Sequence, residues 1–235
     1  MENRKMDKII TIYHGSEKIV EKPILGRGRK NNDFGLGFYC TASKELAKEW
    51  AVSNLYDGIS NCYTLDTEYL NILNLNSSDY SILNWIAVLV EHRVFSIKNP
   101  VARRAKRYLL DNFSINVNAF DLIIGYRADD SYFDYAESFL NNAISVEQLA
   151  RAMKLGKLGE QIVIKSMFAF SKLKYEGYDI ANKDRYYFFR KDRNDEANKL
   201  YMEMLEEESD GLYIQDIMRG GIKNDDPRIP RNISE

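Results

Sequence analysis

Residues 13–16 read YHGS, and residues 33–41 read DFGLGFYCT. The first run follows a stretch, residues 9–13, that is rich in β-branched and aromatic side chains and therefore predicts a strand. A glycine and a serine end this stretch, and both favour a turn. The second run finishes with residues 38–41, which predict another short strand. We therefore expect two early strands, one ending in a histidine and a glycine and the other carrying a tyrosine.

The residues between and after these strands also follow a pattern. Residues 25–37 contain four glycines in an otherwise mostly polar run, which predicts a glycine-hinged surface loop. Ser43 suits a helix N-cap, and the spacing of apolar residues after it predicts a helix over residues 44–56. The expected order is strand, loop, strand, cap and helix.

The composition is that of a chain that folds around a core. Of the 235 residues, 45% are hydrophobic and 12% aromatic. A chain of this length buries roughly 70% of the surface that its unfolded form exposes. No Ser/Gly/Pro-rich linker divides it, so we expect a single domain over residues 1–235, with a polar C-terminal tail that frays from about residue 221. The net charge of -2 argues against a protein that coats DNA.

The cysteines and histidines limit the compartment and the chemistry. Cys40 and Cys62 are too few for a disulfide framework, which favours a reducing compartment, the cytosol. Two cysteines and two histidines do not fall at metal-site spacings, so no bound metal is expected. No apolar run approaches the roughly 20 residues that span a bilayer, and the N-terminus lacks the apolar region of a signal peptide. We therefore expect no membrane association.

Later segments predict further helices and strands. Helices are expected over residues 81–95, 101–111, 145–154 and 196–207, with another ending near residue 140. Strands are expected over residues 120–125, 161–165 and 186–189, and residues 62–65 and 69–75 could form a small antiparallel unit. Ser145 and Gln148 fit a capping box.

The two opening runs resemble the ADP-ribosyltransferase superfamily in its diphtheria-toxin and poly-ADP-ribose-polymerase branch. The resemblance includes the order of the runs, the loop between them and the helix after residue 44, and it extends from about residue 10 to about residue 219. The chain is most similar to a group of uncharacterised bacterial proteins in that superfamily. The resemblance implies an α+β fold, a split mixed β-sheet sandwich with flanking helices.

The resemblance also implies NAD as a substrate and gives roles to the residues of both runs. His14 would hydrogen-bond a ribose hydroxyl, and the backbone of Gly15 with the hydroxyl of Ser16 would bind the nicotinamide carboxamide. Tyr39 offers a flat ring that can stack on nicotinamide. Arg29, with its basic neighbours in the loop, could meet the pyrophosphate or the acceptor.

The third element of the superfamily is a glutamate that opens a later strand. Residues 159–165 read GEQIVIK, so either Glu160 or Gln161 occupies that position. Neighbouring side chains on a strand point to opposite faces, so only one of the two can face the cleft, and the resemblance slightly favours Gln161. A carboxylate would stabilise the positive charge that develops on the ribose, whereas a glutamine would only orient the substrate.

The implied activity is that of a glycosyltransferase, an NAD-dependent ADP-ribosyltransferase that modifies a protein or a nucleic acid. Some members of the bacterial group are regarded as toxins of toxin–antitoxin pairs, which would make an antitoxin protein a partner. The loop at residues 125–130, with Arg127, Asp129 and Asp130, could face the acceptor. The alternatives are an NAD glycohydrolase, an enzyme like the RNA 2′-phosphotransferases, and a non-catalytic module that binds NAD or another nucleotide.

Overall fold

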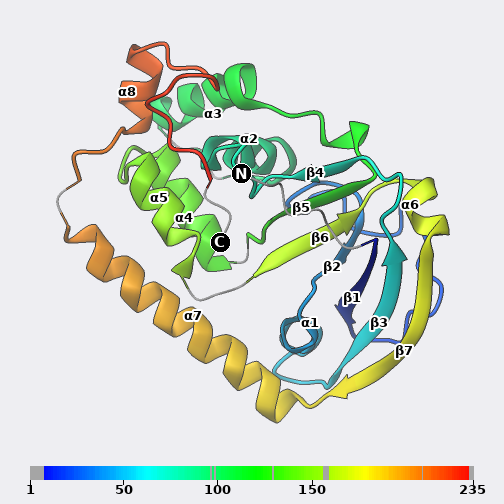
Figure 1. Ribbon diagram of the computed structural model, residues 1–235. Coiled ribbons are helices and arrows are strands. Elements are labelled where there is room, and N and C mark those ends of the chain that lie inside the picture. Colours follow the sequence, from blue (N-terminus) through cyan, green and yellow to red (C-terminus); the bar gives the residue numbers. More distant parts are fainter. Residues whose placement is uncertain are drawn as a thin grey trace.

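Two β-sheets form the framework of the protein. The computed structural model describes residues 8–95, 97, 99–128, 130–155, 159–207 and 209–232 (Figure 1). The first sheet is antiparallel and has the order β1 (Ile9–Ser16), β3 (Gly58–Asp66) and β7 (Leu173–Ala181). The second has the order β2 (Phe38–Cys40), β6 (Glu160–Ile164), β5 (Leu122–Tyr126) and β4 (Ile72–Asn74). It is mixed, because β4 is parallel to β5 while the other pairs are antiparallel.

The two sheets meet at the strands that the opening runs predict. Tyr13 on β1 and Thr41, just after β2, exchange two backbone hydrogen bonds of 2.8 and 2.9 Å. Histidine and tyrosine from the two runs therefore lie next to each other at the junction of the sheets.

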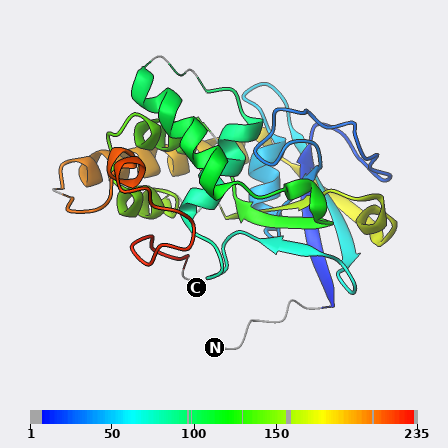
Figure 2. The same ribbon diagram turned by 90° about the horizontal axis from the view of Figure 1, so that it is seen from above.

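Helices cover one face of the second sheet, and α1 packs on a face of the first (Figures 1 and 2). The helices are α1 (Lys44–Ala51), α2 (Ile82–His92), α3 (Pro100–Phe113), α4 (Asp130–Leu140), α5 (Val146–Ala152), α6 (Met167–Ser171), α7 (Lys183–Leu205) and α8 (Ile214–Arg219), with a short 3-10 turn at Val117–Ala119. Helix α1 packs on β1 and β3, and α7 contacts α1 as well as α4 and α5. The expected α+β class, with two sheets and flanking helices, is confirmed.

The main core lies between the second sheet and the helices. Every residue of α2 from Ile82 to Val90 is buried, and this helix packs against α3 and α5. A smaller apolar cluster fills the space between the sheets and includes Ile12, Tyr63 and Ile162.

Local capping signals predict the helix starts well. The Ser43 hydroxyl accepts a hydrogen bond from the backbone N–H of Leu46 at 3.3 Å. The Ser145 hydroxyl and the Gln148 backbone and side chain form the expected capping box. Helix α1 ends at Ala51, five residues before the predicted end.

Two predictions about strands are wrong, and a third strand lacks a prediction. Residues 186–189 lie in the first turns of α7, whose cap, Asn182, accepts from the backbone N–H of Arg185 at 3.2 Å. Residues 62–65 and 69–75 do not pair, because β3 joins the first sheet and β4 runs parallel to β5 in the second. Strand β7 lacks a prediction because its alternation of apolar residues, Leu173 and Tyr175 and then Tyr178 and Ile180, changes phase near Gly177, where the pairing with β3 is irregular.

Two segments that were expected at the surface contribute to the interior. Residues 25–37 form a loop, as predicted, but Asp33 and Phe34 within it are buried. In the tail, Ile222 and Ile229 are only 1% and 2% exposed. The backbone N–H of Asn232 donates to the Tyr80 carbonyl at 2.9 Å, so the tail is packed rather than frayed.

Within the described residues, every helix is too short or too polar to cross a bilayer.

Candidate functional site

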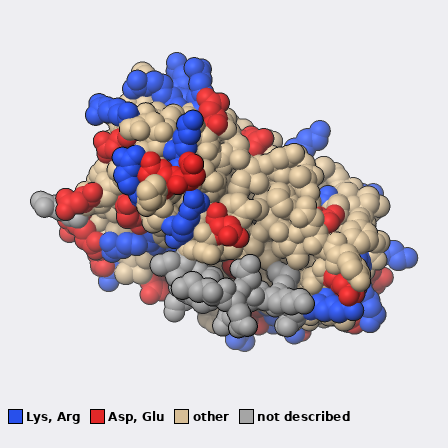
Figure 3. Space-filling view, turned by 45° about the horizontal axis from the view of Figure 1, so that its top comes forward, with Lys and Arg blue, Asp and Glu red and all other residues tan. Residues whose placement is uncertain are grey.

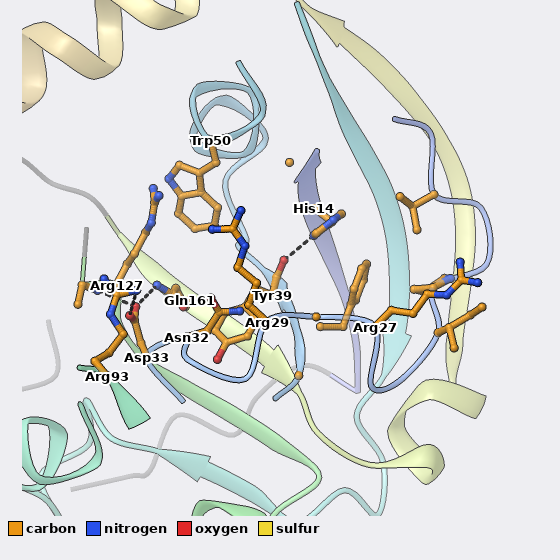
Figure 4. A pocket seen from close by; sticks show the side chains of 18 of the residues that line it. His14, Arg27, Arg29, Asn32, Asp33, Tyr39, Trp50, Arg93, Arg127 and Gln161 are labelled. Atoms are coloured by element: carbon orange, nitrogen blue, oxygen red, sulfur yellow. Dashed lines mark hydrogen bonds and ion pairs between the residues drawn. The ribbon is translucent and has the colours of Figure 1, made fainter. Parts of the chain in front are cut away.

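A cavity of about 690 Å³ opens at the junction of the two sheets (Figure 4). This volume lies within the range of small-molecule sites, about 300–1,000 Å³. The residues on its wall come from β1, the loop after it, β2, α1, β6 and the segments that follow α2 and β5. They include His14, Gly15, Arg27, Arg29, Asp33, Tyr39, Trp50, Arg93, Arg127, Ala128 and Gln161.

His14 presents a hydrogen-bond acceptor at this cavity. Its Nδ1 lies 2.7 Å from the backbone oxygen of Tyr39. A carbonyl oxygen can only accept, so Nδ1 carries the proton and donates. Burial lowers the pKa of His14, although the hydrogen bond to Tyr39 opposes this. The ring is therefore neutral at pH 7, and Nε2 carries a lone pair that can accept a hydrogen bond.

Gly15 contributes its backbone to the cavity wall. Tyr13 directs its N–H and C=O toward Thr41, and backbone groups two residues apart on a strand point the same way. The N–H and C=O of Gly15 therefore point away from β3, beyond the short β2 pairing. A Cβ at this position would lie 2.2 Å from the Ala47 carbonyl oxygen, so the close approach of α1 requires glycine here.

Ser16 is not brought to the cavity. Its hydroxyl donates to the Lys18 carbonyl at 2.7 Å and accepts from the Asn61 side-chain amide at 2.9 Å. The residue fixes the turn after β1, and it does not line the wall where its neighbours His14 and Gly15 lie.

The Tyr39 ring is held in one orientation. Its hydroxyl accepts from the Phe34 backbone N–H at 3.1 Å and donates to the Gly35 carbonyl at 2.6 Å. Gly35 has a φ of +70°, a conformation that glycine adopts without strain. Burial raises the pKa of Tyr39 well above its ordinary value, so the hydroxyl stays protonated.

The structure places Gln161, and not Glu160, on the cavity wall. Gln161 is 4% exposed and lines the cavity. Glu160 is exposed on the other face of β6, where its carboxylate accepts from the Asn76 side-chain amide at 2.6 Å. Strand alternation separates the two neighbours as expected.

A buried carboxylate that sequence reasoning did not assign to the site lies beside Gln161. Asp33 Oδ2 accepts from Gln161 Nε2 at 2.8 Å and from the Ala128 backbone N–H at 2.9 Å. Its Oδ1 lies 3.6 Å from a guanidinium nitrogen of Arg93. Burial raises the pKa of Asp33, while these two hydrogen bonds and the charges of Arg93 and Arg127 oppose the shift. No local pattern in the sequence marks Asp33, because its partner Gln161 lies 128 residues further along the chain.

Positive charge outweighs negative charge on the cavity wall. Lys22, Arg27, Arg29, Arg93 and Arg127 line it, whereas Asp33 is the one acid among the described lining residues. The Arg127 guanidinium lies over the ring of Trp50, 4.5 Å from its centroid. The wall therefore suits an anionic ligand with flat rings.

Two other expectations about charged residues have different outcomes. Lys30 follows Arg29 in the loop but does not line the cavity. Of the segment at residues 125–130, Arg127 reaches the cavity, whereas Asp129 and the Asp130 side chain lie outside the described part of the chain.

A second groove lies between α3 and α8 and shares no lining residue with the cavity. Arg104, Arg107 and Arg219 line it. Figure 3 shows basic side chains gathered toward that end of the molecule, while the part over the strands is mostly uncharged.

Comparison with known proteins identifies a family. No curated protein and no solved structure matches this chain. One family model, described as "Protein of unknown function (DUF3990)", matches residues 10–175. That range is well over half of the chain, and every cavity residue discussed above lies within it. The chain therefore belongs to the DUF3990 family.

Proposed function

We propose that this protein is an NAD-dependent ADP-ribosyltransferase. Such an enzyme breaks the glycosidic bond between nicotinamide and ribose and transfers ADP-ribose to a nucleophile on a protein or nucleic acid. The observation that supports the proposal best is the meeting of His14, Gly15, Tyr39 and Gln161 around one cavity. The resemblance in the sequence assigns His14, Gly15, Tyr39 and either Glu160 or Gln161 to NAD.

The nicotinamide end has complementary partners. A carboxamide offers one acceptor and two donors, which match the N–H and C=O that Gly15 directs away from β3. The Tyr39 ring is fixed by its hydroxyl bonds, and aromatic stacking contributes about 0.5–1.5 kcal/mol beyond burial. A ring that is already fixed loses little entropy when a ligand stacks on it.

The rest of NAD has partners of the required charge. Ribose hydroxyls are donors, and His14 Nε2 is an acceptor for them. The pyrophosphate is anionic, and the exposed guanidiniums of Arg27 and Arg29 lie on the same wall. In the reaction, nicotinamide leaves with the electron pair of the broken bond. The acceptor nucleophile then forms the new bond to the ribose carbon and loses its proton.

One observation favours a second candidate, a module that binds NAD without cleaving it. Gln161 has no charge, so by itself it cannot offset the positive charge that develops on the ribose.

A single assay distinguishes these functions. The purified protein is incubated with NAD labelled in its adenylate part and a bacterial lysate, and nicotinamide release and labelled macromolecules are measured. Transfer predicts both nicotinamide and a labelled macromolecule, with both abolished in Tyr39→Ala. Nicotinamide with free ADP-ribose alone would indicate a glycohydrolase. A cyclic ADP-ribose phosphate formed with 2′-phosphorylated RNA would indicate a phosphotransferase.

Binding without turnover requires a separate measurement. Saturating NAD at about 100 times its dissociation constant stabilises a protein by roughly 2.7 kcal/mol, which a thermal shift detects. A shift without nicotinamide release would support the module, and the absence of both would overturn the proposal.

We also propose that the activity is toxic to bacteria and that an antitoxin protein controls it. Expression of the chain alone should slow growth, and Tyr39→Ala should restore it. Normal growth with wild-type protein that is active in the assay would refute the toxin role.

A further inference from the structure

The Gln161 amide has a defined orientation. Its Nε2 lies 2.8 Å from Asp33 Oδ2, and an ionised carboxylate can only accept (Figure 4). The NH₂ group must therefore face Asp33. The other end, Oε1, is buried and has no hydrogen-bond partner among the described residues. A buried acceptor without a partner is costly in a protein, and here it belongs to a side chain on the wall of a ligand-sized cavity.

Asp33 is itself held in place from several elements. The Ala128 backbone N–H shares Oδ2 with Gln161, and Arg93 lies on the Oδ1 side. The charged and titratable groups that face the carboxylate are Arg93 after α2, Arg127 after β5 and Tyr39 on β2. The carboxylate is thus immobilised directly behind the amide that meets the cavity.

We propose that Asp33 is a positioning residue for NAD cleavage, because it turns Gln161 so that Oε1 accepts a hydrogen bond from a hydroxyl of the nicotinamide ribose. The inference rests on the proposed ADP-ribosyl transfer. It assigns to a carboxylate and an amide together the part that a single glutamate would perform.

The chemistry of bond breaking gives the pair its effect. When the bond to nicotinamide breaks, the electron pair leaves with nicotinamide and positive charge grows on the ribose. The ribose hydroxyl becomes more acidic, and its hydrogen bond to Oε1 strengthens. A carboxylate bonded to the far end of the amide polarises it and makes Oε1 more negative. The stabilisation is therefore greater in the transition state than in the bound substrate, which raises kcat more than it changes KM.

The opposing explanation is that Asp33 only anchors the loop to Ala128. Asp33→Asn separates the two. Asparagine keeps the volume, and with its oxygen in the place of Oδ2 it still accepts from Ala128 and Gln161, but it has no charge to polarise the amide. A structural anchor predicts lower stability with kcat unchanged for the folded fraction.

The test measures nicotinamide release from NAD by wild type, Asp33→Asn, Gln161→Met and the double variant Asp33→Asn/Gln161→Glu. We expect each single variant to lower kcat by about tenfold or more with KM changed less than about threefold. The double variant places a carboxylate directly at the hydroxyl and should recover most of the lost rate. The wild-type kcat should fall on the acid side as Asp33 gains a proton, and Asp33→Asn should lose this contribution while keeping the one that comes from protonation of His14.

The control is Asp66→Asn, which removes another hydrogen-bonded aspartate, one that pairs with Lys172 away from the cavity. It should leave kcat unchanged. An active wild type with an unaltered kcat and pH profile in Asp33→Asn would overturn this inference alone. A wild type that releases no nicotinamide would overturn the proposed function as well. If Asp33→Asn does not fold, two other results test the inference. It is rejected if the kcat of wild type does not fall at acid pH, or if Gln161→Met leaves kcat unchanged.

Discussion

Adjacent residues on β6 illustrate how much one position matters. Glu160 and Gln161 differ by one amide, yet the first is in solvent and the second contacts a buried carboxylate. The sequence supplied both alternatives, and strand alternation guaranteed that only one would face the cavity. The selection depended on which face of β6 lies toward the loop that follows β1, and that is a tertiary property.

The Asp33–Gln161 contact predicts a strong response to Gln161→Glu. The new carboxylate would lie about 2.8 Å from Asp33 Oδ2, and two buried like charges cannot both ionise at that separation. We expect a loss of about 1–3 kcal/mol in the free energy of unfolding at pH 7.5. At least one pKa of the pair is raised in the folded state, so the lost stability should return as the pH falls. Urea unfolding at pH 5 and 7.5 measures both effects.

Two controls accompany this prediction. Glu160→Gln changes the exposed neighbour and should stay within about 0.5 kcal/mol of wild type. Asp33→Asn should relieve the penalty in the double variant. Equal stability of Gln161→Glu and wild type at pH 7.5 would contradict the close contact.

His14 predicts a second pH effect. Burial lowers the pKa of His14, so below the unfolded value of 6.5 the unfolded chain binds a proton that the folded chain does not. The free energy of unfolding should therefore fall as pH drops from 7 through 6.5. Burial also lowers the pKa of His92, which contributes to the same loss. His14→Gln should flatten the slope partially, as measured by urea unfolding between pH 5 and 7.5, and an unchanged slope would show that His14 is not buried.

At the scale of elements, the sequence predicted where helices begin, but it did not predict which strands pair. The starts of α1, α2 and α5 follow from a capping side chain within the same turn, so the sequence reveals them. The first turns of α7 contain the aromatic run YYFF at residues 186–189, whose composition favours a strand. Within this run Tyr186 is buried against Ala51 and Val52 at the end of α1, a contact that local propensity cannot anticipate.

An ion pair with a buried carboxylate joins α1 and α7. Glu49 is buried, and its carboxylate lies 2.7 and 3.1 Å from the Arg193 guanidinium. Arg193→Met would leave that carboxylate buried without the guanidinium. We expect a loss of about 2–4 kcal/mol in the free energy of unfolding, because an uncompensated buried charge is expensive.

The chain provides a matched control for this variant. Arg151 forms an ion pair with Glu207 at 2.6 Å, but both side chains are more than half exposed. Arg151→Met should change the free energy of unfolding by less than about 1 kcal/mol, because solvent screens exposed pairs. Similar effects of the two variants would mean that the α1–α7 pair is not buried.

At the scale of the whole molecule, the resemblance implied the α+β class with two sheets, but nothing in the sequence predicted the sheet order. Of the residues that the resemblance selected, five line one cavity, namely His14, Gly15, Arg29, Tyr39 and Gln161, whereas Ser16 and Glu160 do not. Asp33 was not assigned to the site from the sequence, because its hydrogen bond to Gln161 joins residues 128 positions apart and leaves no local pattern. The packing of the tail was not predicted for a similar reason, because two isoleucines in a polar, proline-containing segment do not form a periodic apolar pattern.

The tail gives a prediction for the whole fold. Ending the chain at Gly221 removes the buried side chains of Ile222 and Ile229 and the bond from Asn232 to Tyr80. Full burial of such a side chain contributes about 1.5–3 kcal/mol, so the truncation should cost about 3 kcal/mol or more. Thermal unfolding of the shortened and full-length proteins measures the loss. An unchanged midpoint would mean that the tail is loose in solution.

The loop of residues 25–37 has a buried part and a solvent-exposed part. Asp33 and Phe34 are inserted into the interior, whereas Arg27 and Arg29 stand in solvent on the cavity wall. A substitution of either arginine therefore leaves the packing of Asp33 and Phe34 in place. Within one family, the exposed residues can therefore vary with the ligand group that binds at the cavity entrance, while Asp33 and Phe34 stay unchanged. Protein engineers can vary the same exposed residues.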